Sequence, residues 1–122
     1  MRIPTAVLIA LLSASPAMAI DFSQPLTTLD GKPFKDPSGQ VSDVTLAVIA
    51  ENALLQAYSD EQNLSGEEKI KRYALARKIE DNKKVDLSAE EIALLKKLIA
   101  KSYNPLITGQ SWKMLDPASV PK

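Results

Sequence analysis

The sequence predicts a mainly α-helical fold, a small bundle of three to four helices preceded by an N-terminal β-hairpin or extended arm. Apolar residues recur at helical spacing through most of residues 42–115. Two serine-led start signals divide that region into segments of helix length. Three of the eight prolines and two of the four glycines lie in residues 20–41, which disfavours a helix there. Residues 1–19 and 116–122 differ in composition from both regions and are treated separately.

The first 19 residues have the order of a secretory signal peptide. Arg2 is their only charged residue, an apolar run covers residues 6–12, and the segment ends in the small-residue cleavage pattern Ala17-Met18-Ala19. The apolar run is too short to span a bilayer. We therefore expect cleavage after Ala19 and export to the periplasm or out of the cell. The alternative is that translation starts at Met18, in which case the chain stays in the cytoplasm.

Residues 20–41 are expected to form the hairpin or arm. Asp30-Gly31 is a two-residue turn signal, because both central positions of such a turn favour positive φ, so residues 26–29 and 32–34 can pair. Pro33 confines the second strand to an edge, because proline has no backbone N–H to donate. A lone hairpin is marginal in water. We therefore expect its apolar side chains to pack on the helices: Phe22, Leu26, Leu29 and Phe34.

The first predicted helix runs from an N-cap at Ser42 or Asp43 to about Tyr58. It is apolar over most of its circumference, which is typical of a central helix.

A fourth helix is expected after Asn104-Pro105, because asparagine is a good N-cap and proline is favoured in the first helical position. Residues 116–122 show no periodicity and are expected to form a frayed tail.

Two capping boxes predict the second and third helices. Ser65 with Glu68, and Ser88 with Glu91, have the spacing in which the serine accepts from the N3 amide and the glutamate from the N-cap amide. The helices are expected over residues 66–81 and 89–103. Because capping and the helix dipole both favour acids at helix starts, the pairs Glu67-Glu68 and Glu90-Glu91 are interpreted as structural and not as an acid/base dyad.

The composition argues against most familiar enzyme designs. The chain has 15 Lys+Arg against 15 Asp+Glu, with no His and no Cys. It therefore lacks an imidazole base, a thiolate nucleophile and the usual zinc ligands. Residues 80–91 imitate the length of a calcium loop, but Lys84 and Val85 stand where an oxygen ligand and a glycine are needed. We expect no catalytic residues, no cofactor and no metal.

Basic residues gather between positions 69 and 84, but they point in different directions on a helical wheel and alternate with acids. A charge-balanced set of this kind is typical of a solvated surface, because binding a nucleic-acid backbone needs a coherent positive stripe. No nucleic acid is therefore expected as a partner. The residues are Lys69, Lys71, Arg72, Arg77, Lys78, Lys83 and Lys84.

Several strings resemble those of small phage- and prophage-encoded proteins of unknown function. They are Leu29-Asp-Gly-Lys-Pro33, the block 66–76, the block 87–97 and Pro105-Leu-Ile-Thr-Gly-Gln110, and the resemblance spans about residues 20–115. Members of that group begin near the hairpin and lack an export signal, so the leader departs from the group's pattern. The resemblance implies no catalytic residues.

The remaining hypothesis is a non-enzymatic protein-interaction or assembly module. The helix over residues 66–81 has two apolar faces, one with Ile70 and Tyr73 and the other with Leu75 and Ile79. We expect internal packing to cover one face, leaving Leu75, Ile79 and Trp112 partly exposed as candidate partner-binding residues. Trp112 has the alternative roles of a core anchor or a lid over the hairpin. The alternative functions are an exported protein of unknown binding role, a weak nucleic-acid binder, or an enzyme that uses carboxylates alone.

Overall fold

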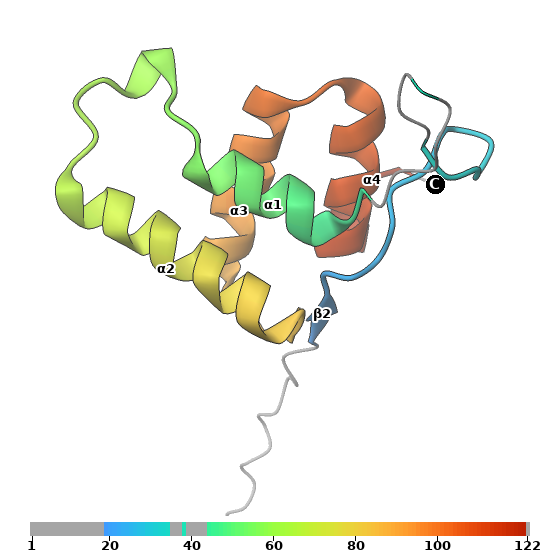
Figure 1. Ribbon diagram of the computed structural model, residues 1–122, viewed down its shortest axis with the longest axis horizontal. Coiled ribbons are helices and arrows are strands. Elements are labelled where there is room, and N and C mark those ends of the chain that lie inside the picture. Colours follow the sequence, from blue (N-terminus) through green and yellow to red (C-terminus); the bar gives the residue numbers. More distant parts are fainter. Residues whose placement is uncertain (1–18, 35–37, 39–43, 122) are drawn as a thin grey trace, which may run out of the picture.

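The computed structural model describes residues 19–34, 38 and 44–121. The predicted mainly helical bundle is confirmed (Figure 1). Helix α1 packs against α2 on one side and α3 on another, while α4 packs against α3. The elements are β2 (Ile20–Asp21), α1 (Leu46–Leu55), the 3₁₀ turn η2 (Ser59–Glu61), α2 (Gly66–Asn82), β3 (Lys84–Val85), α3 (Ala89–Ser102), α4 (Pro105–Leu115) and the 3₁₀ turn η3 (Pro117–Ser119).

Helix α1 is the central helix that its composition predicts. Its alanines let neighbouring backbones approach, and most of its side chains join one core with residues from every other helix and from the arm. The predicted boundaries are wrong, because the N-cap is Thr45 and the helix ends at Leu55, before Tyr58. The predicted N-caps Ser42 and Asp43 lie outside the described residues. The core comprises Phe22, Leu26, Leu46, Ala47, Ile49, Ala50, Ala53, Leu54, Leu75, Ala76, Ile79, Val85, Leu95, Leu98, Ile99, Ile107 and Leu115.

The arm explains why α1 begins where it does. The first amides of a helix have no partner within the helix. Here Leu46 N donates to the carbonyl of Gln24 at 2.9 Å, and Ala47 N donates to that of Phe22 at 2.8 Å. The Thr45 hydroxyl accepts from Val48 N at 3.3 Å. The arm therefore supplies the acceptors that start the central helix.

The pairing of the arm differs from the predicted hairpin. Strand β2 pairs antiparallel with β3, which lies between α2 and α3. Around Asp30-Gly31, the one bridge among the described residues joins Thr27 to Pro33, and only Gly31 of the two turn residues has positive φ, at 88°. Gly31 N donates to Thr28 O, and Thr28 N to Lys32 O. The turn is thus a three-residue loop closed by a left-handed glycine, and not the predicted two-residue turn.

The apolar residues of the arm divide between core and surface. Phe22 and Leu26 are fully buried, as predicted, and Phe34 packs partly against the core. The prediction for Leu29 is wrong: it lies in the turn itself and is 92% exposed. The arm also contacts α4, because the Gln110 amide donates to Thr27 O at 2.6 Å and accepts from Thr27 N at 2.9 Å.

The starts of α2, α3 and α4 follow the predicted caps. Ser88 and Glu91 form the complete capping box, with hydrogen bonds of 3.1 and 2.8 Å. Ser65 accepts from Glu68 N at 3.1 Å, but the Glu68 carboxylate turns toward Arg72 instead of closing the box. Asn104 caps α4, and Pro105 occupies its first turn.

The chain beyond α4 is more ordered than the predicted tail. It forms η3, where the Ser119 hydroxyl donates to Asp116 O at 2.8 Å. The Asp116 carboxylate pairs with Lys96 of α3 at 3.0 Å. Within the described ranges, no helix combines the length and the apolar character needed to cross a membrane.

Candidate functional site

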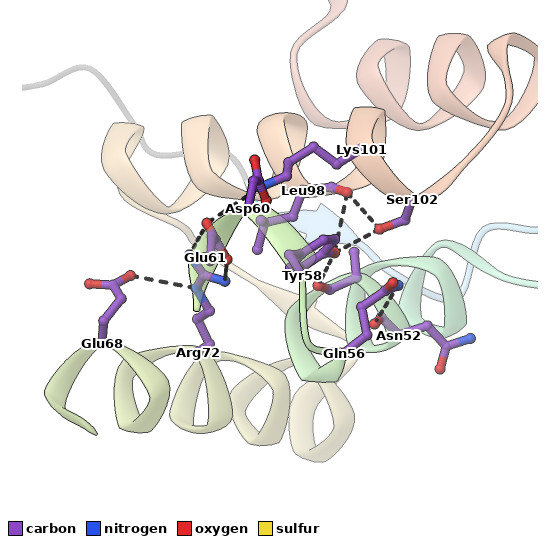
Figure 2. Close-up of polar contacts among 11 residues, drawn as sticks. Asn52, Gln56, Tyr58, Asp60, Glu61, Glu68, Arg72, Leu98, Lys101 and Ser102 are labelled. Carbon is purple, nitrogen blue, oxygen red and sulfur yellow. Dashed lines mark hydrogen bonds and ion pairs between the residues drawn. The ribbon is translucent and has the colours of Figure 1, made fainter. Parts of the chain in front are cut away.

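A buried ion pair fixes the loop between α1 and α2. The Arg72 guanidinium donates to both carboxylate oxygens of Glu61, at 2.7 and 3.0 Å (Figure 2). The side chains of Arg72 and Glu61 are only 6% and 12% exposed. The hydrogen bonds from Arg72 hold the pKa of Glu61 down to about 2. The prediction that Arg72 belongs to a solvated basic surface is therefore wrong, because it lies on the face of α2 that packs inward.

Tyr58 and Lys101 attach the same loop to α3. The Tyr58 hydroxyl donates to Ala53 O at 2.5 Å and lies 2.6 Å from the Ser102 hydroxyl (Figure 2). The Lys101 ammonium sits 4.6 Å from the centre of the Tyr58 ring and 2.9 Å from Asp60. Partial burial raises the pKa of Tyr58, which keeps its hydroxyl protonated as a donor. Residues 56–64 are thus tied to α1, α2 and α3 together.

This loop forms one wall of an open cavity of about 510 Å³ beside the C-terminal end of α1, here termed the end pocket. Half of its lining residues are apolar or aromatic, and its charged members are Glu61, Lys69 and Arg72. Glu61 and Arg72 neutralise each other, whereas Lys69 has no ion pair with any described residue. The lining is Leu54, Leu55, Gln56, Ala57, Tyr58, Glu61, Gln62, Leu64, Lys69 and Arg72.

Exposed large hydrophobic side chains concentrate on α1 and α2. Val48 is 42% exposed, Leu55 58%, Ile70 68% and Tyr73 59%, and we define these four residues as the α1–α2 face. Among the described residues the other strongly exposed large hydrophobic side chain is Leu29, in the distant turn. Val48 and Leu55 are seven residues apart, and Ile70 and Tyr73 three, so each pair lies on one side of its helix.

A smaller cavity of about 250 Å³, the seam groove, runs between the two helices. It is lined by Glu51, Leu55, Tyr73, Ala76, Arg77 and Glu80. Leu55 also lines the end pocket, so the two cavities adjoin. Along α1 and α2, Lys69 lines the end pocket, and Glu51 and Glu80 line the adjoining seam groove.

The charges in the seam groove are only partly paired. Arg77 is engaged by Asp81 at 3.1 Å, and Glu80 by Lys83 at 2.8 Å. Glu51 has no cation within ion-pairing distance among the described residues, and its Oε2 atom is shielded from solvent. Partial burial, together with the neighbouring Glu80 carboxyl, raises the pKa of Glu51. One proton shared between Glu51 and Glu80 would join them by a hydrogen bond.

The structure does not place the candidate partner-binding residues on one surface. Leu75 and Ile79 are buried in the core, so their predicted exposure is wrong: α1 packs on that face and leaves Ile70 and Tyr73 on the surface. Trp112 is partly buried, and its indole N–H donates to the carbonyl of Lys96 in α3 at 3.0 Å. The Lys96 ammonium lies 4.7 Å from the centre of the Trp112 ring. The polar contacts of Trp112 are therefore with α3 and not with the hairpin.

No cluster of three or more potential metal ligands occurs among residues 19–34, 38 and 44–121. The stretch that imitates a calcium loop is used otherwise. Lys84 and Val85 pair with β2, and the Lys83 ammonium binds Glu80.

Comparison with known proteins identifies no relative of this chain. No family model matches the chain, and neither the curated proteins nor the solved structures contain a match. The function must therefore be inferred from the chemistry of the surface.

Proposed function

We propose that this protein is a non-enzymatic protein-interaction or assembly module, and that the α1–α2 face is its binding surface. The observation that carries the proposal is the concentration of exposed apolar side chains. Four of the five large hydrophobic residues that are exposed in the described chain lie on these two helices. Isolated exposed hydrophobic residues are ordinary, but a group of them beside open cavities is typical of a surface that a partner covers.

The end pocket suits the apolar anchor that protein interfaces commonly use. Binding energy is usually concentrated in a few side chains that fill well-formed pockets. The end pocket is about half apolar, and Leu55 at its rim is exposed. The Arg72–Glu61 pair and the Tyr58 hydrogen bonds hold the loop wall before any partner arrives. A wall fixed in advance lowers the ordering cost of binding.

The carboxylates near this surface are better explained by structure than by catalysis. Glu80 is paired with Lys83, and Glu61 with Arg72. A catalytic dyad needs two carboxyl groups that are free to exchange protons with a substrate. Among the described residues, Glu51 is the one groove carboxylate without a cation at ion-pairing distance, so a second free carboxyl group is lacking there.

We also propose that binding takes place outside the cytoplasm. This part rests on the order of charge, apolar run and small-residue exit in residues 1–19. The proposal concerns the compartment in which a partner is met and is independent of the binding surface.

The double substitution Ile70→Ser with Tyr73→Ser tests the binding surface. Both side chains are more than half exposed, so the free energy of unfolding should change by no more than about 0.5 kcal/mol per site. Cross-linking in the native host, together with mass measurement over a range of protein concentrations, should show partner capture or self-association by the wild-type chain and its loss in the variant.

Leu29→Ser is the matched control, because it removes an exposed leucine that lies in the turn of the arm and outside the proposed surface. It should leave the association unchanged. Association that survives the double substitution, or that Leu29→Ser removes equally, would rule out the α1–α2 face as the binding surface.

A further inference from the structure

We propose that the α1–α2 face binds an amphipathic helix of a partner protein. An acidic residue of the partner helix would pair with Lys69 and a basic residue with Glu51, and these two pairs would set its orientation. This inference rests on the proposed function and specifies the chemistry of the partner. Neither charge is needed for the fold, since no described residue forms an ion pair with either side chain.

The shape of the surface favours a helical occupant. α1 and α2 lie side by side and run in opposite directions (Figure 1). Leu55 and Tyr73 line the seam groove from the two helices, and Val48 and Ile70 are exposed on the same two helices. A helix that presents an apolar stripe fits a groove with two helical walls, as in other helix-in-groove complexes.

The end pocket gives the surface its positive end. Three charged residues line it, and the two buried ones, Glu61 and Arg72, cancel. Lys69 is exposed and forms no ion pair with any residue that the structure describes, and the amides of Gln56 and Gln62 line the same cavity. The net charge of the lining is therefore positive, which favours a carboxylate beside the apolar anchor of the partner.

The seam groove gives the surface its negative end. Its lining carries Glu51, Glu80 and Arg77; because Glu80 is paired with Lys83, Glu51 is the lining carboxylate without an ion pair among the described residues. Arg77 is already engaged by Asp81. A lysine or arginine of the partner, with its aliphatic stem against Leu55 and Tyr73, would bring to Glu51 the cation that the fold does not provide.

The spacing of these charges sets the spacing in the partner. Glu51 lies in the groove alongside Arg77 and Glu80 of α2. These residues follow Lys69 by about two to three helical turns, or roughly 12–16 Å along the helix axis. A partner helix should therefore carry its acidic and basic residues about eight to eleven positions apart, on either side of its apolar stripe.

The test uses a displayed library of 18-residue, alanine-rich peptides that carry leucine at helical spacing. Positions 4, 5, 13, 14 and 15 are varied among Glu, Lys and Gln, so that the varied charges can lie eight to eleven residues apart, and the target is the folded full chain. We expect enrichment of peptides with Glu at one end and Lys at the other, about eight to eleven residues apart. Resynthesised peptides of this type should bind about three- to ten-fold more tightly than versions with glutamine at both charged positions.

Charge variants of the protein identify the two contacts. Lys69→Glu should change the preference at one end of the peptide from Glu to Lys, and Glu51→Gln should reduce the preference for Lys at the other end. Lys97→Glu alters an exposed lysine of α3 that forms no ion pair within the described part of the chain; it is the matched control and should change neither preference. Thermal unfolding of each variant verifies that its fold is retained.

The outcomes separate this inference from the proposed function. Peptides that require Tyr73 and Ile70 but show no charge preference overturn the inference and leave the binding surface in place. No enrichment beyond that on the Ile70→Ser, Tyr73→Ser variant overturns both. A wild-type chain that forms a dimer through this face, with the double variant monomeric, identifies a second copy as the occupant and also overturns the inference.

Discussion

Acid should destabilise this protein largely through one side chain, Glu61. Arg72 lowers the pKa of Glu61 from 4.5 to about 2. A carboxyl group with a lowered folded-state pKa stabilises the fold above its unfolded pKa, and this contribution is lost as the pH falls toward the folded pKa. At 1.36 kcal/mol per pH unit, the shift corresponds to roughly 3 kcal/mol between pH 5 and pH 2. Because the Glu61 side chain is only 12% exposed, solvent screening should reduce this little.

The assay is urea unfolding of the wild-type chain and Glu61→Gln at a series of pH values from 7 to 2. Glu61→Gln leaves a buried guanidinium without its carboxylate and should cost about 3 kcal/mol at pH 7. The difference between the two proteins should shrink toward zero as the pH approaches 2. Asp60→Asn is the control, since its exposed pair with Lys101 should contribute less than about 1 kcal/mol. A difference that stays constant from pH 7 to pH 2 would refute the reasoning.

Four further results are expected. Ser88→Ala should lower the free energy of unfolding by about 1 kcal/mol, because Ser88 caps α3, whereas Glu90→Gln should cost a few tenths; equal losses would contradict the observed cap. Leu75→Ala should cost about 2–5 kcal/mol in the same urea assay, as for a core leucine, and a loss below about 0.5 kcal/mol would contradict its burial. The pKa of Glu51 is raised, so its neutral form favours folding and this contribution is lost as the pH rises. Glu51→Gln should therefore be more stable than the wild type at pH 7 and equally stable in acid, and a variant that is less stable at pH 7 would contradict the raised pKa. Protein isolated from its native host should have the intact mass of a chain that begins at Ile20, and a mass that retains Met18 would remove the leader hypothesis.

Local signals in the sequence were sufficient for most of the helical framework. Caps act within four residues of a helix start, so Ser65, Ser88 and Asn104 could be located without knowledge of the fold. The start of α1 could not, because its first amides donate to the arm, more than twenty residues earlier in the sequence. The pairing of β2 with β3 is likewise non-local, and two residues are too short a run to show a pattern.

Only part of the candidate site could be predicted from the sequence. The sequence identified two apolar faces on α2 but assigned the exposed role to Leu75 and Ile79, because a helical wheel does not show which face the rest of the chain covers. The position of Arg72 did contain a signal. It lies three residues before Leu75 and seven before Ile79, on the same stripe, and a cation on a buried stripe requires an anion. That the anion is Glu61 depends on how the loop folds back.

The short ladder between β2 and β3 would affect the order of events if the chain is cut at the expected leader site. Ile20 pairs with Val85, and Phe22 N donates to Lys83 O at 2.7 Å. A cut after Ala19 would fall directly beside this ladder, whereas a protease needs an opened stretch of chain around the bond that it cleaves. Once the fold has closed, opening the chain around this bond would require β2 to detach, which would also withdraw the carbonyl of Phe22 from the start of α1. Removal of a leader and folding would therefore compete in time, and rapid folding before export would preserve the uncut chain.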